Sequence, residues 1–486
     1  MSIKNTDLRG PSRREFLQGG AAATGAALVS SILPPGMAQP QVKKPNLLFI
    51  LGEGQRADAL SLAGNPILRT PNMDRIGREG VWFKNSFCTN ALCAPARATA
   101  LTGLYSHVTG AIDNREPKVP LPADIPLFTD LLHQAGYEVA IVGKVHVKNG
   151  VKERYWDYYF GFNAAVTDYY KPRFTEGRNG KIGEEITYDG YADDLVTDRA
   201  LAWLNEKREK PFCLLVWYQT PHAPFFRARR HLDLYNGLAI PKPSTFDDDL
   251  KGYPGKPAFG ETDNKIGTVE NMNATRTLEE VVKDYNAGLV DVDENIGRIF
   301  NLLEKKNELD ETAILLSSDH GFFLGEWRLY DKRFMHEPSI RLPTMLRYPR
   351  RIKAGTTREE MVLDIDIAPT MLDLAGVAIP VQMQGKSMLG LTDPKREKWR
   401  EDWFYHYYEY PQPGFVQPHV GVRTERYKLI HYYVTNAFEL YDLHTDPGEL
   451  HNLANLPEHS VIQGTLIARL AALREELGDK TGARPT

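Results

Sequence analysis

The chain has 486 residues, of which 42% are hydrophobic and 10% are aromatic, which is enough for a large core. Its formal net charge of −4 gives no reason to expect a nucleic-acid partner. No run in the body of the chain is long and apolar enough to span a bilayer, so we expect no stable membrane insertion.

The N-terminus has the pattern of an export signal. Arg13 and Arg14 precede a weakly apolar stretch over residues 19–33, and small residues follow at 36–38. This order is typical of a twin-arginine signal with cleavage after Ala38. We therefore expect residues 1–38 to be removed, the twin-arginine translocase to be a partner, and the mature protein to be periplasmic or secreted.

A predicted strand and a predicted helix follow. Residues 46–51 form an aliphatic run that predicts a buried strand, and Glu53 comes directly after it. Residues 93–102 are rich in alanine, with a proline in the first turn and a glycine after the end, which predicts a helix. Cys93 is therefore expected at a helix N-terminus, where backbone N–H groups and the helix dipole favour negative charge. Arg97 lies four residues further on, on the same face.

Strands and helices alternate through the rest of the larger part of the chain. Three further runs predict buried strands, at residues 138–142, 212–217 and 312–317. Three segments have helical period, at residues 127–135, 193–207 and 278–306. This alternation predicts an α/β fold with a large mixed, mostly parallel sheet between helical layers. We expect two polar and aromatic segments, 150–191 and 224–273, to be long irregular insertions.

The composition changes after Gly376. Tyrosine-rich runs at 403–408 and 427–433 precede a terminal helix predicted over residues 461–477. We therefore expect a larger domain over residues 39–376 and a smaller C-terminal α+β subdomain over 377–486, with a short antiparallel sheet and a packed helix.

The cysteines are three in number, Cys88, Cys93 and Cys213. An odd number leaves at least one thiol unpaired, so a disulfide framework is not what holds this fold together. We do not expect Cys88 and Cys93 to pair.

Charged and imidazole side chains follow each of the four predicted strands. In chain order they are Glu53; Lys144 and His146; His222; and Asp319 and His320. Open α/β sheets bind ligands beyond the carboxyl ends of their strands. Each of these residues taken singly is more often a surface or structural residue, but their shared position predicts that they converge on one crevice with Cys93.

The segment that begins at Cys93 resembles the signature of the sulfatase family, Cys-x-Pro-x-Arg followed by Leu-Thr-Gly. Other segments resemble further elements of that family, namely Gly143–His146, Thr220–Pro224, Ser318–Gly321 with Leu324–Glu326, Lys332–Glu337, Asp366–Thr370, Arg423–Lys428 and Glu439–Leu443. On this resemblance, which spans nearly the whole mature chain, the protein is identified as a member of the type-I, formylglycine-dependent sulfatases of the alkaline phosphatase-like superfamily.

The resemblance implies a covalent role for Cys93. A formylglycine-generating or sulfatase-maturating enzyme would oxidise it to formylglycine, whose hydrate attacks the sulfur of a sulfate ester. The other implied roles are stabilisation of the hydrate by Arg97 and Lys144, sulfate binding and protonation of the leaving alcohol by His222 and Lys332, and release of sulfate by His146. Histidine and lysine suit this chemistry because they move protons and neutralise an anionic transition state.

The implied metal site departs from the family at one position. The family usually carries two adjacent aspartates after its first strand, where this chain has Glu53 and Gly54. The implied ligands are Glu53, the oxygen at position 93, Asp319 and His320, with Ca²⁺ expected and Mg²⁺ less favoured. Loss of one carboxylate predicts weaker metal binding. A water or Gln55 fills the position, or the site is degraded.

The substrate class has one leading interpretation and two alternatives. Aromatic residues in the predicted insertions favour a sulfated carbohydrate. Phosphate or phosphonate ester hydrolysis on the same scaffold is the first alternative, because a fold does not fix the substrate. The second is a non-catalytic binder of sulfated glycans that has lost its metal.

Overall fold

The computed structural model describes residues 43–114, 121–147, 150–247, 266, 276–393, 398–410 and 416–480. The predicted export signal, residues 1–38, lies outside these ranges. Within them no helix combines the length and the apolar composition that a membrane span requires.

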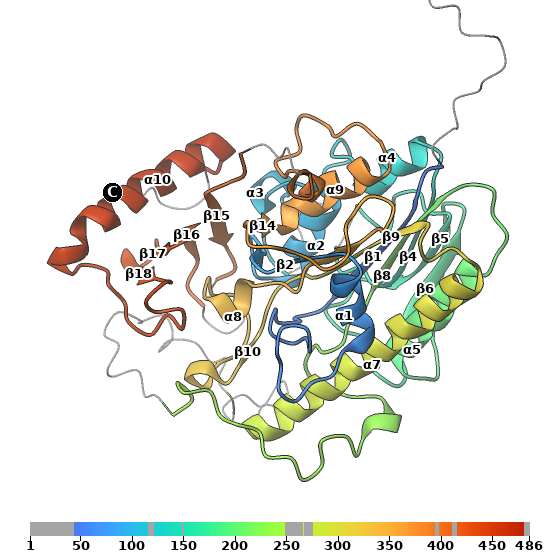
Figure 1. The fold of residues 1–486 in the computed structure, drawn as a ribbon, viewed down its shortest axis with the longest axis horizontal. Helices are drawn as coiled ribbons and strands as arrows, with labels where there is room; N and C mark the ends of the chain where they lie inside the picture. Colours follow the sequence, from blue (N-terminus) through green and yellow to red (C-terminus); the bar gives the residue numbers. More distant parts are fainter. Residues whose placement is uncertain are drawn as a thin grey trace, which may run out of the picture. The chain divides into compact units, whose positions relative to one another are not determined.

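A ten-stranded sheet carries the main body of the chain, in the order β13-β2-β12-β9-β1-β8-β4-β5-β6-β7 (Figure 1). In that order the strands are Thr356–Arg358, Val81–Phe83, Met345–Arg347, Thr312–Ser318, Asn46–Gly52, Phe212–Trp217, Glu138–Lys144, Tyr158–Phe162, Arg173–Arg178 and Lys181–Thr187. The central strands from β9 to β5 are parallel, whereas β12, β6 and β7 run antiparallel to their neighbours. The predicted mixed, mostly parallel sheet is confirmed.

Helices cover both faces of this sheet (Figure 1). They are α1 (Pro71–Arg78), α5 (Ala192–Leu204) and α7 (Leu278–Lys305) on one face, and α2 (Cys93–Thr102), α4 (Phe128–Gln134) and α9 (Ile367–Leu374) on the other. Side chains alternate across a strand, so Leu48 and Ile50 of β1 join the apolar cluster of the first layer, and Leu47 and Phe49 join that of the second. Burial on both faces explains why this strand is an unbroken apolar run.

The segment 150–191 corrects the prediction of an irregular insertion. It contains β5, β6 and β7, which extend the main sheet at one edge. Its aromatic residues pack against each other within this edge, and the rings of Phe160 and Phe174 stack with centroids 4.3 Å apart. The described part of 224–273 contains one short 3₁₀ turn, η1 (Arg229–His231).

A separate four-stranded antiparallel sheet forms the C-terminal part, as predicted. Its strands are β15 (Asp402–Tyr407), β16 (His419–Thr424), β17 (Tyr427–Tyr432) and β18 (Ala437–Asp442), and α10 (Ser460–Leu477) packs beside it (Figure 1). The boundary at residue 376 stays a prediction.

Short elements connect these layers. They are β3 (Ser86–Phe87) paired with β14 (Val362–Leu363), the hairpin of β10 (Phe323–Leu324) and β11 (Tyr330–Asp331), α3 (Ser106–Thr109), α8 (Glu337–Ile340), and the 3₁₀ turns η3 (Glu326–Arg328), η4 (Asp364–Asp366), η5 (Met388–Leu391) and η6 (Pro457–His459). The β10–β11 hairpin matters most for the site, because Lys332 comes directly after it.

Candidate active site

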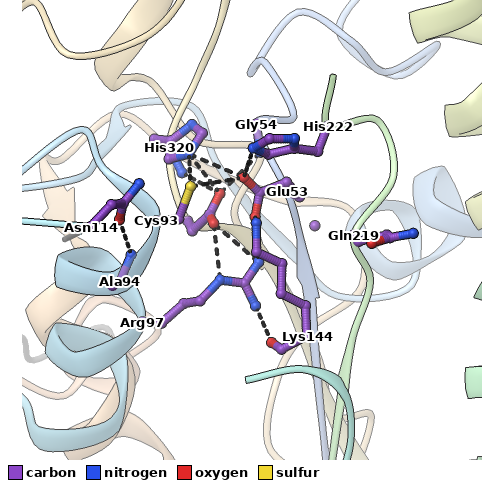
Figure 2. Close-up of polar contacts among 12 residues, drawn as sticks. Glu53, Gly54, Cys93, Ala94, Arg97, Asn114, Lys144, Gln219, His222 and His320 are labelled. Carbon is purple, nitrogen blue, oxygen red and sulfur yellow. Dashed lines mark hydrogen bonds and ion pairs between the residues drawn. The ribbon is translucent and has the colours of Figure 1, made fainter. Parts of the chain in front are cut away.

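The carboxyl ends of β1, β4, β8 and β9 meet at one edge of the sheet because these strands are parallel neighbours. Glu53, Lys144, His222, Asp319 and His320 lie at or just beyond these ends, and the N-terminus of α2 brings Cys93 to the same place. Figure 2 shows Glu53, Arg97 and His320 gathered around Cys93, with His222 beside Glu53. The predicted convergence of these residues is what the structure shows.

Arg97 joins the two carboxylates of the cluster. Its Nη2 donates to Glu53 Oε2 over 2.7 Å, its Nε donates to Asp319 Oδ2 over 3.1 Å, and its Nη1 donates to the carbonyl of Lys144 over 2.5 Å. Its guanidinium also lies 5.3 Å from the centre of the Trp217 ring. All three charged side chains of this triad, Arg97, Glu53 and Asp319, are fully buried. The guanidinium therefore fixes the position of both carboxylates.

Cys93 lies between an acid and an imidazole. Its thiol donates to Glu53 Oε1 over 3.0 Å, and its Sγ is 3.3 Å from His320 Nε2. Burial alone would raise the pKa of this thiol, and so would Glu53, but Lys144, Lys332 and His320 together hold that pKa well below its ordinary value. The site therefore stabilises negative charge at position 93.

The cluster fits a divalent cation. The ligand atoms of Glu53, Cys93, Asp319 and His320 all lie within 4.8 Å of one another, and all four residues are buried. His320 Nδ1 faces the carbonyl of Gly321 at 2.8 Å, so the ring directs Nε2 at the other three ligands.

The electrostatics of this cluster favour positive charge at its centre. Burial and the negative Glu53 raise the pKa of the Asp319 carboxyl, because two buried carboxylates repel each other. Asp319 in turn raises the pKa of His320 against the effect of burial. A cation bound between Glu53 and Asp319 would offset this repulsion between their carboxylates.

Lys144, the last residue of β4, and His146, two residues further on, contact the cluster. Lys144 Nζ is 2.7 Å from Glu53 Oε2. His146 is buried, and burial lowers its pKa to about 4, although its hydrogen bond to Cys93 acts in the opposite direction. Its φ of 46° is unusual for a residue other than glycine. Strained backbone conformations of this kind cluster at functional sites.

His222 and Lys332 complete the predicted set. His222 Nδ1 is 2.5 Å from the carbonyl of Ala223, which leaves Nε2 on the side of Glu53, 3.9 Å from Oε1. Lys332 is buried and 3.0 Å from Asp331, whose carboxylate raises the pKa of the lysine against the effect of burial. Lys332 also lowers the pKa of Cys93, so its charge acts within the same site.

Gly54 has a left-handed backbone, with φ of 59°. Its N–H donates to Asp319 Oδ1 over 3.0 Å, and its carbonyl accepts from the Tyr285 hydroxyl over 2.8 Å. A Cβ at this position would lie 3.2 Å from Phe322 and 3.4 Å from the His320 ring. The position where the family usually carries an aspartate therefore borders the His320 ring in this chain.

Two residues that sequence reasoning missed support the site from outside. Asn114 Oδ1 accepts from the N–H of Ala94, which is a free donor at the start of α2 (Figure 2). Glu409, just past β15, accepts from the N–H of Asn114 at 3.2 Å and from Arg333 Nε at 3.4 Å. Neither residue stands in a recognisable motif, and no spacing in the sequence places them near Cys93.

The three cysteines are free and buried, in agreement with the prediction that no disulfide joins Cys88 and Cys93.

A buried cysteine at a helix N-terminus, with carboxylates and cations around it, suits the hydrolysis of an anionic ester, and the scaffold is that of the alkaline phosphatase-like hydrolases. The family model described as "Sulfatase" matches residues 45–377, and that described as "N-sulphoglucosamine sulphohydrolase, C-terminal" matches residues 325–476. The chain therefore belongs to the sulfatase family, whose members hydrolyse sulfuric ester bonds.

Individual relatives agree with this assignment. The chain is 36% identical to an N-acetylglucosamine-6-O-sulfatase of Bacteroides thetaiotaomicron over 90% of this chain and 88% of that protein. It is similar to a solved structure of a protein in complex with its substrate D-glucosamine-2-N,6-O-disulfate, with a TM-score of 0.83 and 34% identity over 90% of this chain and 99% of that one. A phosphonate monoester hydrolase from Silicibacter pomeroyi has a TM-score of 0.75 at 20% identity over 91% of this chain and 100% of that one, a likeness that shows the fold alone.

Proposed function

We propose that this sulfatase acts on a sulfated carbohydrate, and specifically on the 6-O-sulfate of a glucosamine derivative. The observation that carries the proposal is the buried Cys93, held between Glu53 and His320 in a set of cationic groups. The choice of sugar is supported by the 36% identical relative, which is named for that reaction.

Cys93 is the residue that we propose to be oxidised to formylglycine, whose hydrate supplies the nucleophilic oxygen. The side-chain N–H groups of the fully buried Arg97 donate to Glu53, Asp319 and the carbonyl of Lys144. We therefore propose that Arg97 serves the hydrate by positioning the carboxylates, and that Lys144, 2.7 Å from Glu53, supplies positive charge beside it.

Ca²⁺, with Mg²⁺ less favoured, would be held by Glu53, Asp319, His320 and the oxygen at position 93. Such a cation supplies charge neutralisation and orients the sulfate group. The fit of the buried cluster to a cation favours an enzyme over a binder that has lost its metal.

We assign proton transfer and sulfate binding to His222, Lys332 and His146. His222 Nε2 faces the cluster, which supports our proposal that this nitrogen donates a proton to the leaving alcohol. Lys332 brings a buried positive charge close enough to Cys93 to lower the pKa of its thiol, and we propose that this charge binds a sulfate oxygen. His146, whose low pKa keeps its imidazole neutral at neutral pH, is placed to accept a proton from the group at position 93 when sulfate is released.

The cellular route follows from the sequence and from the modification. We propose export through the twin-arginine translocase to the periplasm or the medium, after a formylglycine-generating or sulfatase-maturating enzyme has acted in the cytoplasm. Cleavage after Ala38 would leave a catalytic domain over 39–376 and the C-terminal subdomain over 377–486.

A comparison of matched esters tests the proposed function. The modified protein is assayed with glucosamine 6-sulfate and glucosamine 6-phosphate, before and after chelation and with Ca²⁺ restored. We expect turnover of the sulfate ester, its loss on chelation, and its return with Ca²⁺. Preferred turnover of the phosphate ester would assign the site to the phosphate alternative, and sugar binding without turnover of either ester would assign it to the binder.

A further inference from the structure

A pocket of about 350 Å³ opens beside the segment that carries His222. Its lining residues include Tyr170, Lys171, Asp189, Tyr191, Arg229 and Arg230. None of these side chains takes part in the site around Cys93 described above.

The pocket lies at the same edge of the sheet as the active site. Asp193, at the start of α5, accepts from the backbone N–H groups of Gln219 and Thr220, which directly follow β8. The Tyr169 hydroxyl donates to the His222 carbonyl over 2.5 Å. Arg229 lies seven residues after His222, so their Cα atoms are at most roughly 25 Å apart. The two sites are therefore close enough for one ligand of a few sugar residues to reach both.

The pocket presents two positive charges, on Arg229 and Lys171. The guanidinium of Arg229 stacks over the Tyr170 ring at 5.3 Å, and the Tyr170 hydroxyl is fixed by the carbonyl of Arg227 at 2.8 Å. The backbone N–H of Lys171 donates to Asp168 over 2.7 Å, which fixes the turn that carries this lysine. Among the described residues no carboxylate forms an ion pair with either Lys171 or Arg229. Both charges are therefore available to a ligand.

The other charged residues that line the pocket are Arg230, Asp194 and Asp189. Arg230 pairs with Asp194 at 2.6 Å, with Glu294 at 2.9 Å and with Asp291 at 3.2 Å, so its charge is neutralised within the protein. Asp189 is exposed, and Lys171 and Arg229 are the lining cations that form no ion pair with a carboxylate of the described residues. An aromatic ring beside such cations suits a sugar ring that carries an anionic group.

We propose that this pocket binds an anionic sugar residue, sulfated or uronic, of the same chain that presents its sulfate ester to Cys93. The proposal rests on the proposed function, because it assigns the pocket to an extended sulfated glycan. It predicts that the enzyme distinguishes an oligosaccharide from the monosaccharide through Lys171 and Arg229.

The test compares two substrates in the double variant Lys171→Ala/Arg229→Ala. They are a 6-O-sulfated glucosamine monosaccharide and a hexasaccharide in which the same sugar alternates with uronic acid. We expect the ratio of the hexasaccharide KM to the monosaccharide KM to rise about tenfold, since each lost contact is a charge-assisted hydrogen bond. The matched control is Lys181→Ala, which removes an exposed lysine of β7 away from the pocket and should leave the ratio unchanged. A carboxyl-reduced hexasaccharide distinguishes a bound carboxylate from a bound sulfate.

An unchanged ratio in a double variant that still hydrolyses both substrates would overturn the proposal. If the double variant does not fold, the salt dependence of the wild-type protein decides instead, and equal dependence of both KM values on salt would overturn it. If the wild type hydrolyses neither sugar, the proposed function fails. The pocket is then tested by calorimetric binding of the hexasaccharide to Cys93→Ala, with and without Arg229→Ala.

Discussion

Arg97 belongs to a buried charge cluster that serves function and adds no net stability to the fold. Its guanidinium and the carboxylates of Glu53 and Asp319 are completely buried, and desolvation of such groups costs as much as their attraction returns or more. A packed apolar cluster would be at least as stable, so the buried charges are best explained by what they hold. They fix two carboxylate oxygens beside the atom at position 93.

Gly54→Asp tests the missing metal ligand. Aspartate tolerates the left-handed backbone better than most residues, and its Cβ would lie beside the His320 ring. We expect the added carboxylate to tighten Ca²⁺ binding about tenfold by titration of chelator-treated protein. Gly54→Ala is the matched control, because it carries the same strain without the oxygen. Equal affinity of the two variants would show that position 54 does not face the cation.

Cys93→Ala tests the nucleophile. Deleting one sulfur leaves a small cavity, so we expect a folded protein whose unfolding free energy falls by about 1 kcal/mol. Sulfate ester turnover should fall to background, since no other residue supplies the reacting oxygen. Cys88→Ala is the control, because it removes an equally buried thiol outside the cluster and should keep most of the turnover. Comparable turnover of Cys93→Ala and Cys88→Ala would contradict the role of Cys93.

At the scale of elements, the C-terminal sheet supports the two segments that carry Cys93 and Lys332. Glu409, just after β15, holds Asn114 beside the start of α2, and it holds Arg333 next to Lys332. The Tyr405 hydroxyl of β15 donates to the carbonyl of Arg333 over 2.7 Å. Asp331 and Arg333 have φ values of 81° and 95°, a strained backbone around Lys332 that these contacts hold in place.

Glu409→Gln is expected to lower kcat about tenfold with a smaller change in KM, because it loosens the position of Lys332 and Cys93 without removing a reacting group. Glu425→Gln, in the exposed turn between β16 and β17 of the same sheet, is the control and should leave kcat unchanged. Steady-state kinetics and thermal unfolding are measured together, and Glu409→Asp should restore part of kcat. An unchanged kcat in a folded Glu409→Gln protein would limit this residue to a structural role.

The central elements of the fold could be predicted from the sequence because buried parallel strands are short unbroken apolar runs. The run 46–51 corresponds to β1, and the run 212–217 matches β8. Strands at the edge of the sheet carry no such signal. β7 is exposed along most of its length, so its residues are polar and were predicted as part of an irregular insertion.

The same contrast holds within the site. Residues that directly follow a central strand, such as Glu53 and His320, are placed by topology alone. Asn114 and Glu409 reach the site through contacts between segments 295 residues apart, and only tertiary structure brings these together. The positive φ of Gly54 is likewise a property of the fold and not of the motif.

At the scale of the whole molecule, the chain joins a catalytic sheet, a supporting C-terminal sheet and a predicted export signal. Replacing Arg13 and Arg14 with lysine should leave the full-length precursor in the cytoplasm, because the twin-arginine pathway requires that pair. Immunoblots of cytoplasmic and periplasmic fractions measure how much full-length precursor stays in the cytoplasm, with Arg9→Lys as a matched control. Normal periplasmic recovery of the double variant would rule out this route.

The most direct test of the central claim is the mass of the peptide that contains Cys93, taken from protein co-expressed with a formylglycine-generating enzyme. We expect most of this peptide to have the mass of an aldehyde in place of the thiol, and we expect the aldehyde fraction to follow sulfate ester turnover from one preparation to the next. Full turnover in protein whose Cys93 peptide has only the mass of the unmodified thiol would contradict the central claim.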